Sequence, residues 1–307
     1  MKNRAKGTRI VVFQEMTDDV RVRPQAHPRT GRVRRDRQVR EVNPADARAL
    51  DIALATRAGL EGASVVTLHL GAEGGEPLLR EALARGSDEA IRIWDEECYD
   101  IEGPAKAAIL AAAATAADFD LVLAGTGGTT TSGAQVGVLT AAELKVSCVT
   151  QAVGLDVLPT ENAARVTRLP AGGFRETLEV DLPAVVTVAP VDRDLVVAPL
   201  PALLEARAGD IPVMSLAELG VPPERLRSAR SALRRGLPQT PRPPVSPLSA
   251  PDPALEAFER IRLLVQGSVS RRGGRTVRGA PERLAEQLFE ELREEGWLDH
   301  LRERNAE

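Results

Sequence analysis

Short apolar runs alternate with helical segments through the first half of the chain, and this alternation constrains the fold more than any other feature. Four apolar runs have the length and composition of buried strands: residues 9–13, 64–70, 90–94 and 120–124. The helical segments between and after them are residues 43–60, 76–85, 104–117 and about 134–144. This order predicts the α/β class, with a mostly parallel twisted sheet and helices on both faces.

The first of these helices has clear start signals. It opens with Asn43, Pro44, Ala45 and Asp46. The Asn43 side chain can accept an N–H of the first turn, and the fixed φ of Pro44 suits the first helical position. The carboxylate of Asp46 is favourable near the positive end of the helix dipole. We therefore expect the helix to begin directly after Asn43.

A loop rich in glycine and hydroxyl residues follows the strand predicted at 120–124. Its residues are Gly125, Thr126, Gly127, Gly128, Thr129, Thr130, Thr131, Ser132, Gly133, Ala134, Gln135 and Val136. Small residues let backbone N–H groups approach a phosphate closely, and the next helix start adds a positive dipole end. The glycine spacing matches neither the dinucleotide fingerprint nor a Walker loop. The segment is therefore either a nucleotide-binding loop or a strand-to-helix turn without a ligand.

Candidate ligand-binding positions cluster at the predicted strand ends. Phe13, Asn43, Leu70 and the loop that begins at Gly125 all lie at or just after such an end. Ligands of open parallel sheets bind in a crevice beyond the carboxyl ends of the strands. We therefore expect these positions to converge on one crevice.

Residues 1–235 are expected to form the α/β core, with a β-rich addition at about 150–190. Strands are predicted in this addition at residues 164–168, 176–181 and 184–189. A basic segment at 20–42 has the alternation and turn residues of a hairpin-like excursion. A basic helix, whose charged side chains would face solvent, is predicted over 222–236.

The end of the chain is predicted to be a separate arm. Residues 236–254 hold a dense cluster of prolines and form a linker. The arm, residues 255–307, contains a strand-like run at 261–265 and an amphipathic helix at 281–295. Because one strand and one helix cannot build a core alone, we expect the arm to dock on the main body or on another chain.

Composition excludes several classes of function. The chain has 307 residues, a formal net charge of −4 and only 3% aromatic residues, which is not typical of a protein that binds nucleic acid. Two cysteines without a CxxC motif exclude a disulfide framework and fit a reducing, cytoplasmic setting. The sequence has no apolar stretch of the roughly 18 residues that a membrane span needs. Its N-terminus lacks the apolar region of a signal peptide.

The sequence shows no catalytic or metal-binding constellation. No Ser/His/Asp set can be built around His27, His69 or His300, and no HExxH, EF-hand or carboxylate-cluster motif is present. His69 alternates along a strand beside the expected crevice, where a structural role is the commoner one. We therefore predict no catalytic residue and no metal, and we favour binding over self-sufficient catalysis.

Several of these segments together resemble the β subunit of electron-transfer flavoproteins, and the resemblance runs over nearly the whole chain. The segments that carry it are the Asn-Pro helix start at 43–50, the helix and glycine at 78–88, the loop at 120–137 that closes on Gln-Val-Gly, Val166-Thr167-Arg168, the glycine pair at 172–173, Glu176-Thr177-Leu178 and the block at 182–186.

The resemblance implies an electron carrier subunit. Such a β subunit pairs with a larger α subunit that holds most of the FAD. The pair accepts electrons from a flavin-dependent dehydrogenase and passes them toward a quinone oxidoreductase or a similar acceptor. The β subunit also binds AMP, or a second FAD in the electron-bifurcating branch. The positions that match the family's nucleotide site are Phe13, Asn43 to Asp46, Leu70 and Gly125 to Val136.

Three further residues and the arm acquire roles from the resemblance. Arg168 matches a position near the flavin of the partner chain. Leu200 and Pro201 lie in the loop at about 197–210 that recognises the dehydrogenase. A run of lysines that normally follows is absent here, so we expect a specialised dehydrogenase partner in a divergent branch of the family. The arm would wrap around the α subunit.

Two other interpretations stay open. The chain could be a stand-alone adenine-nucleotide-binding sensor on a similar α/β sheet, although such a sensor would end near residue 150. It could also be a purely structural assembly subunit whose crevice is empty. The β-rich addition, the linker and the arm favour the electron carrier.

Overall fold

The computed structural model describes most of the chain and divides it into two compact units, Met1–Pro241 and Arg242–Glu307. The described residues are 7–27, 29–34, 37–99, 101–127, 135–170, 172–190, 196–229, 236, 254–266 and 278–294. The loop residues 128–134, the proline-rich residues 237–253 and the C-terminal residues 295–307 lie outside them.

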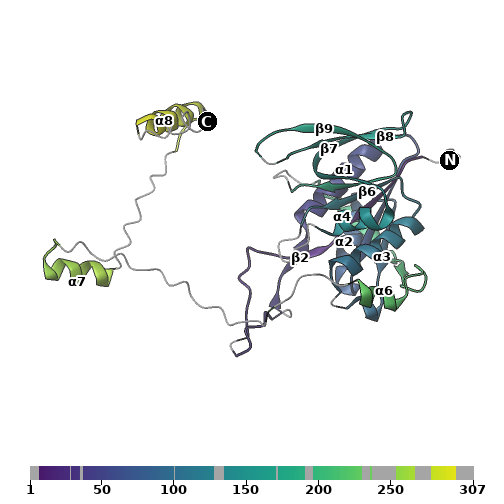
Figure 1. Cartoon of the computed structure of the whole chain (residues 1–307), viewed down its shortest axis with the longest axis horizontal. Coiled ribbons are helices and arrows are strands. Elements are labelled where there is room, and N and C mark those ends of the chain that lie inside the picture. The colour runs from purple at the N-terminus through teal and green to yellow at the C-terminus, as the bar shows by residue number, and fades with distance from the viewer. Residues whose placement is uncertain are drawn as a thin grey trace. The chain divides into compact units, whose positions relative to one another are not determined.

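A nine-stranded sheet forms the centre of the first unit (Figure 1). Its order is β11-β5-β4-β1-β6-β10-β7-β8-β9. The strands from β11 to β7 pair in parallel, whereas β7, β8 and β9 pair antiparallel. Their bounds are β1 Arg9–Phe13, β4 Ser64–Leu70, β5 Glu89–Ile93, β6 Leu121–Gly125, β7 Ser147–Leu158, β8 Ala163–Arg168, β9 Glu176–Asp181, β10 Ala184–Val188 and β11 Val213–Met214.

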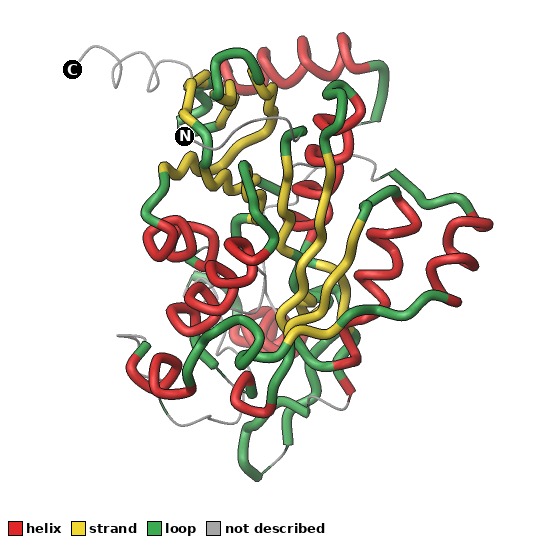
Figure 2. Tube along the Cα trace, turned by 90° about the vertical axis from the view of Figure 1, so that its right-hand side faces the viewer, coloured by secondary structure: helices red, strands yellow, loops and turns green. Residues whose placement is uncertain are grey.

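Helices cover both faces of this sheet, as predicted (Figure 2). They are α1 Pro44–Ala58, α2 Glu76–Arg85, α3 Gly103–Ala116 and α4 Val136–Leu144. Side chains of a strand alternate between faces. Ile10 and Val12 of β1 therefore pack in one cluster with α1, whereas Val11 and Phe13 pack in another with α3. Burial on both faces explains why the parallel strands read as continuous apolar runs.

The predicted β-rich addition is part of the same sheet. The strands predicted at 164–168 and 176–181 are β8 and β9, which form an antiparallel edge beyond β7. The strand predicted at 184–189 is β10, and it lies between β6 and β7 in the parallel part. The last strand of this region thus completes the middle of the sheet.

A two-stranded antiparallel sheet begins the excursion predicted at 20–42. Strands β2, Met16–Asp18, and β3, Arg40–Val42, pair with each other, and a bridge joins Ala26 to Val33 farther out. The hairpin-like prediction is therefore confirmed. Met16 and Val42, at the base, pack with Leu78 and Leu79 of α2.

The remaining elements of the first unit are short. The 3-10 helices are Glu73–Gly75 and Glu96–Cys98, and helix α5 is Leu200–Ala208. Helix α6, Pro223–Ser228, covers only the first part of the basic helix predicted over 222–236, and residues 230–235 lie outside the described chain.

The second unit contains two described helices, α7 Ala257–Gln266 and α8 Pro281–Glu294. The helix predicted at 281–295 is confirmed, but the strand-like run at 261–265 is wrong. Apolar residues at 258, 261 and 265 have the three-to-four-residue spacing of a helix, which the five-residue window concealed. Among the described residues, no helix is both long enough and apolar enough to cross a membrane.

Candidate functional site

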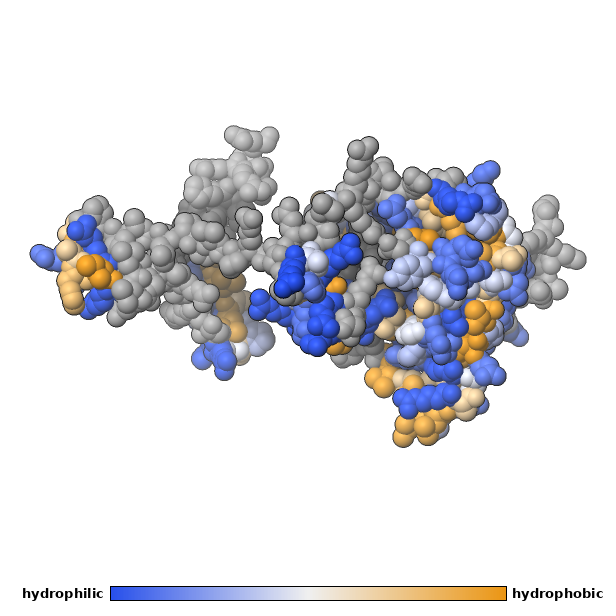
Figure 3. Space-filling model, turned by 90° about the horizontal axis from the view of Figure 1, so that it is seen from below, coloured by the Kyte–Doolittle hydropathy of each residue, from blue (hydrophilic) through white to orange (hydrophobic). Residues whose placement is uncertain are grey.

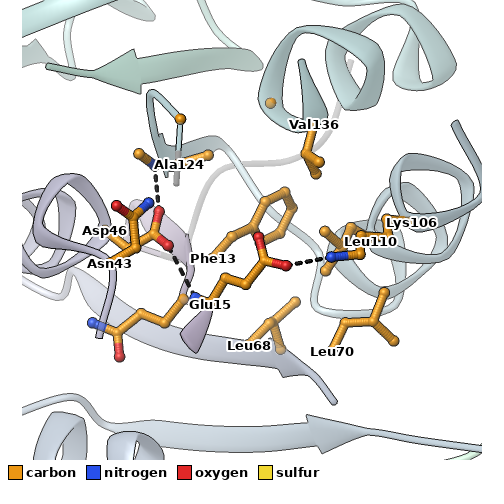
Figure 4. A pocket seen from close by; sticks show the side chains of 14 residues that line it. Phe13, Glu15, Asn43, Asp46, Leu68, Leu70, Lys106, Leu110, Ala124 and Val136 are labelled. Atoms are coloured by element: carbon orange, nitrogen blue, oxygen red, sulfur yellow. Dashed lines mark hydrogen bonds and ion pairs between the residues drawn. The ribbon is translucent and has the colours of Figure 1, made fainter. Parts of the chain in front are cut away.

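A pocket opens at the carboxyl ends of β1, β4 and β6 (Figure 4). The empty space between its lining atoms is about 500 Å³, a figure that includes the part open to solvent. Its lining residues are Phe13, Gln14, Glu15, Asn43, Asp46, Leu68, Leu70, Lys106, Leu110, Ala124, Gly125, Gly127, Val136 and Gly137. The expected crevice is therefore present where the strand ends meet.

Apolar side chains from four elements form one part of the wall. They are Phe13 from β1, Leu68 and Leu70 from β4, Leu110 from α3 and Val136 from α4. Figure 4 shows these side chains on the side of the pocket away from Asp46. A wall of this kind can hold a planar ring by burying its faces.

The start of α1 supplies a polar corner of the pocket. Asn43 is the N-cap, and its side chain accepts a hydrogen bond from the Ala45 backbone N–H at 3.4 Å. The backbone N–H of Asn43 donates to the Glu15 carbonyl at 2.9 Å. Pro44 occupies the first helical position, as the sequence predicts. The cap therefore fixes the helix start beside the connection that follows β1.

Asp46 joins three segments around the pocket. It is buried, and its Oδ1 accepts a hydrogen bond from the Gly125 N–H at 2.6 Å. Its Oδ2 accepts a second from the Glu15 N–H at 2.9 Å. One carboxyl group thus joins α1, the connection after β1 and the last residue of β6, where the glycine-rich segment begins. A Cβ at Gly125 would lie 2.6 Å from the Asp46 backbone nitrogen, so no larger residue fits there.

Burial also changes the proton affinity of this carboxyl group. Desolvation raises the pKa of Asp46 to about 7, although the hydrogen bonds from Gly125 and Glu15 favour the ionised form. The negative charge of Glu15 nearby acts in the same direction as burial. Asp46 therefore titrates near neutral pH, where a surface aspartate is fully ionised.

An ion pair spans the other side of the pocket. The ammonium group of Lys106, on α3, contacts the carboxylate of Glu15. Their side chains are 23% and 34% exposed. Among the described lining residues, Lys106 is the only cationic side chain. The described lining residues therefore supply one cationic group and two carboxyl groups.

His69 has a structural position behind the pocket. It is buried on β4, and its Nδ1 lies 2.8 Å from the Gln14 carbonyl oxygen. Burial lowers the pKa of this imidazole, which favours the neutral ring. The histidine therefore supports the connection that carries Gln14 and Glu15.

The structure brings together many of the predicted binding residues. Those that line the pocket are Phe13, Asn43, Asp46, Leu70, Gly125, Gly127 and Val136. Pro44, Ala45, Thr126 and Gln135 are neighbours in sequence but do not line it. The Thr126 hydroxyl instead donates to the Val188 carbonyl at 2.9 Å. The predicted residues Gly128, Thr129, Thr130, Thr131, Ser132, Gly133 and Ala134 lie outside the described chain.

Sequence reasoning missed the residues that α3 contributes. Lys106 and Leu110 are four positions apart, so they lie on one face of this helix. A single lysine in an otherwise alanine-rich helix was the available signal. Glu15 was also missed as a lining residue, because it follows β1 in a connection without regular pattern.

The structure does not bring the other three predicted residues to the pocket. Arg168, on β8, donates to the Glu176 carboxylate at 2.7 Å. Leu200 and Pro201 begin α5, where the Leu200 side chain is exposed. Arg80 of α2 holds the other end of α5, because its Nη1 donates to the Ala206 carbonyl at 2.8 Å.

Comparisons with known proteins agree on one family. The model of the electron transfer flavoprotein domain family matches residues 30–219. The chain is 31% identical over 198 residues to the caffeyl-CoA reductase-Etf complex subunit CarD of Acetobacterium woodii, covering 64% of this chain and 74% of that protein. It is 27% identical over 170 residues to an electron transfer flavoprotein subunit beta of Methylophilus methylotrophus, covering 55% of this chain and 64% of that protein.

Proposed function

Because this chain belongs to the electron transfer flavoprotein domain family and has an electron-transfer role within an Etf complex, we propose that it is the β subunit of a heterodimeric electron-transfer flavoprotein. In this proposal an α subunit holds most of the FAD. The pair takes electrons from a flavin-dependent dehydrogenase and passes them toward a quinone oxidoreductase or a similar acceptor. Its two free cysteines, Cys98 and Cys148, fit a cytoplasmic setting.

The pocket is the observation that carries the nucleotide part of the proposal. It lies at the strand ends, combines an apolar wall with a polar corner, and is lined by Gly125, Gly127 and Val136 from the two ends of the glycine-rich segment. We propose that this pocket and the adjoining loop hold the adenosine part of AMP or of a second FAD. Both ligands share this part, so the described wall is compatible with either.

A released-ligand experiment tests this proposal. The chain is purified with the flavoprotein chain that accompanies it, denatured, and the supernatant is analysed by absorbance and chromatography. FAD together with AMP, or FAD in excess of one per pair, supports the proposal. Isolation of the chain alone, without any adenine compound, would contradict it.

The position of β10 favours this proposal over the stand-alone sensor. A sensor that ended near residue 150 would lack the strand that pairs with both β6 and β7. Its sheet would then have β6 as an open edge. The described sheet reaches its full width only with the region beyond residue 150.

The helices of the second unit support docking of the C-terminal arm on the α subunit. Phe258 and Ile261 of α7, and Leu288 and Phe289 of α8, are exposed within the described residues. Figure 3 shows hydrophobic and hydrophilic side chains next to each other on α7, at the far left of the view. Exposed apolar faces of this kind mark interaction surfaces. We propose that the α subunit covers them.

We propose that α5 is the docking site for the dehydrogenase, with Leu200 and Pro201 at its start. Val197 and Leu200 are 84% and 68% exposed, and Leu204 is exposed on the same helix. Three hydrogen bonds from Arg80 to the Ala206, Arg207 and Gly209 carbonyls hold the far end of the helix. An apolar surface on a fixed helix is suited to a short-lived protein contact. For Arg168, proximity to the partner flavin stays a prediction.

We expect Leu200→Ala to slow electron transfer from the dehydrogenase about tenfold at limiting protein concentration. This corresponds to about 1.4 kcal/mol for one exposed apolar anchor. The rate at saturating dehydrogenase should change little, because the flavin chemistry is untouched. Stopped-flow reduction of the complex measures both rates, and Val20→Ala, another exposed apolar truncation, is the matched control. An unchanged rate in a correctly folded Leu200→Ala complex would remove α5 as the docking site.

A further inference from the structure

The charges inside the pocket are arranged around a single ammonium group. Lys106 is the one cationic side chain among the described lining residues, and Glu15 and Asp46 carry the two carboxyl groups. Figure 4 shows the Glu15 side chain extending from the connection after β1 toward Lys106 on α3. The ammonium group is therefore already paired with an anion that belongs to the chain itself.

The two carboxyl groups are held in different ways. Both oxygens of Asp46 accept backbone N–H groups, at 2.6 Å from Gly125 and 2.9 Å from Glu15. These bonds fix Asp46 in place. The Glu15 carboxylate makes one hydrogen bond within the described chain, and its partner is Lys106. Hydrogen bonds to Asp46 and Asn43 hold its backbone, so its side chain can turn away from the pocket without breaking another hydrogen bond or ion pair of the described residues.

The ion pair is also one that an anion from solution can exchange. Both side chains are about a quarter to a third exposed, and water screens pairs of this kind strongly. A phosphate group offers more negative charge than a carboxylate and several strong acceptor oxygens. It can therefore replace the Glu15 carboxylate at Lys106 when a ligand places it there.

We propose that Glu15 is an internal competitor for the phosphate of the bound nucleotide, and that Lys106 is the group for which the two compete. This inference rests on the proposed nucleotide site. A phosphorylated adenine compound gains the contact with Lys106 only by displacing the Glu15 carboxylate. An unphosphorylated one, adenosine, leaves the ion pair intact. Glu15 thus lowers the affinity for the anionic part of the ligand and leaves the adenosine part unaffected.

The experiment titrates the full-length chain, freed of bound nucleotide, with adenosine and with AMP by isothermal titration calorimetry. Glu15→Gln removes the competing charge, so we expect AMP to bind about tenfold more tightly, as one charge-assisted hydrogen bond allows. Adenosine affinity should stay within about twofold on the same reasoning. Lys106→Gln should weaken AMP about tenfold, and the double variant should match Lys106→Gln.

Salt gives a readout that a purely structural role would not change. In the natural chain one ion pair replaces another, so AMP affinity should depend weakly on ionic strength. In Glu15→Gln the Lys106 ammonium group no longer pairs with Glu15, so it attracts the phosphate by a charge interaction that salt screens. AMP affinity should therefore fall more steeply between about 0.05 and 0.2 M salt, where the Debye length shortens from about 14 to 7 Å. Glu41→Gln is the matched control, because Glu41 pairs with Arg21 and does not line this pocket.

The possible outcomes separate this inference from the proposed function. If Glu15→Gln tightens adenosine and AMP equally, Glu15 only obstructs the pocket, and the competition is refuted. An unchanged AMP affinity in either single variant also refutes it, while the nucleotide site itself stands. If no adenine compound binds the natural chain or any variant, the proposed nucleotide site fails, and the inference fails with it.

Discussion

Asp51→Ala is expected to lower the free energy of unfolding by roughly 3–5 kcal/mol, which is typical when one partner of a buried ion pair is removed. Asp51 lies on α1 and pairs with Arg85 at the end of α2, and the two side chains are only 5% and 2% exposed. Arg48 approaches the same carboxylate at 3.8 Å. Without Asp51 the buried Arg85 guanidinium would lose the carboxylate with which it pairs within the described part of the chain. Chemical denaturation of the purified chain measures the loss.

Two further variants separate the buried charge from simple loss of packing. Asp51→Leu combined with Arg85→Met removes both charges while keeping apolar volume, so this double variant should recover most of the stability. Glu179→Ala, which breaks the exposed pair with Arg165, should leave the unfolding transition nearly unchanged. A double variant as unstable as Asp51→Ala would show that the pair acts through shape and not through charge.

Asp46→Ala is expected to weaken adenine-nucleotide binding at least tenfold and to lower the free energy of unfolding by about 2–4 kcal/mol. The variant leaves the N–H groups of Gly125 and Glu15 without their acceptor, at about 1–3 kcal/mol for each buried unsatisfied group. The end of β6 and the connection after β1 would no longer be joined by a shared carboxyl group. Calorimetric titration with AMP and denaturant unfolding measure the two effects. Normal AMP affinity would show that the glycine loop holds its position without Asp46.

The raised pKa of Asp46 also predicts how stability depends on pH. Its pKa is about 7 in the folded chain and about 3.9 in an unfolded one, so the folded state binds more protons between these values. Stability from this group is therefore present at low pH and falls as pH rises from about 4 to 7.

An asparagine at position 46 isolates this pH effect. Asp46→Asn removes the titrating carboxyl group at this position. As pH rises, the natural chain should therefore lose unfolding free energy relative to this variant. The expected shift is about 2–3 kcal/mol between pH 5 and 8. Denaturant unfolding of both proteins at each pH gives the difference. A shift of opposite sign would mean that the two N–H bonds outweigh desolvation.

Much of the architecture could be predicted because its signals are local. Continuous apolar runs identified the buried parallel strands, and the Asn43 cap with Pro44 placed the start of α1 correctly. The convergence of Phe13, Leu70 and Gly125 followed from a general property of parallel sheets. These inferences needed only neighbouring residues or the known geometry of strand ends.

The rest depends on contacts between distant segments. Glu15 and Lys106 are 91 positions apart, and nothing near either residue in the sequence indicates that they meet. The Asp46 carboxylate likewise accepts a hydrogen bond from a backbone N–H 79 positions away. The place of β10 between β6 and β7 depends on which strand edge is still unpaired, and an apolar run carries no information about its neighbours. Helix α7 was misread because a short apolar window fits either period.

The central position of β10 affects how the chain can fold during synthesis. When a ribosome has released the residues up to β6, that strand has an unpaired edge and no partner yet exists for it. This edge is paired only after β7, β8 and β9 have been synthesised, when β10 (Ala184–Val188) inserts between β6 and β7. Closing a long loop is entropically costly and slow. The nascent protein therefore carries an aggregation-prone strand edge while the segment between β6 and β10 is being synthesised, and a premature stop before residue 184 would leave that edge unpaired.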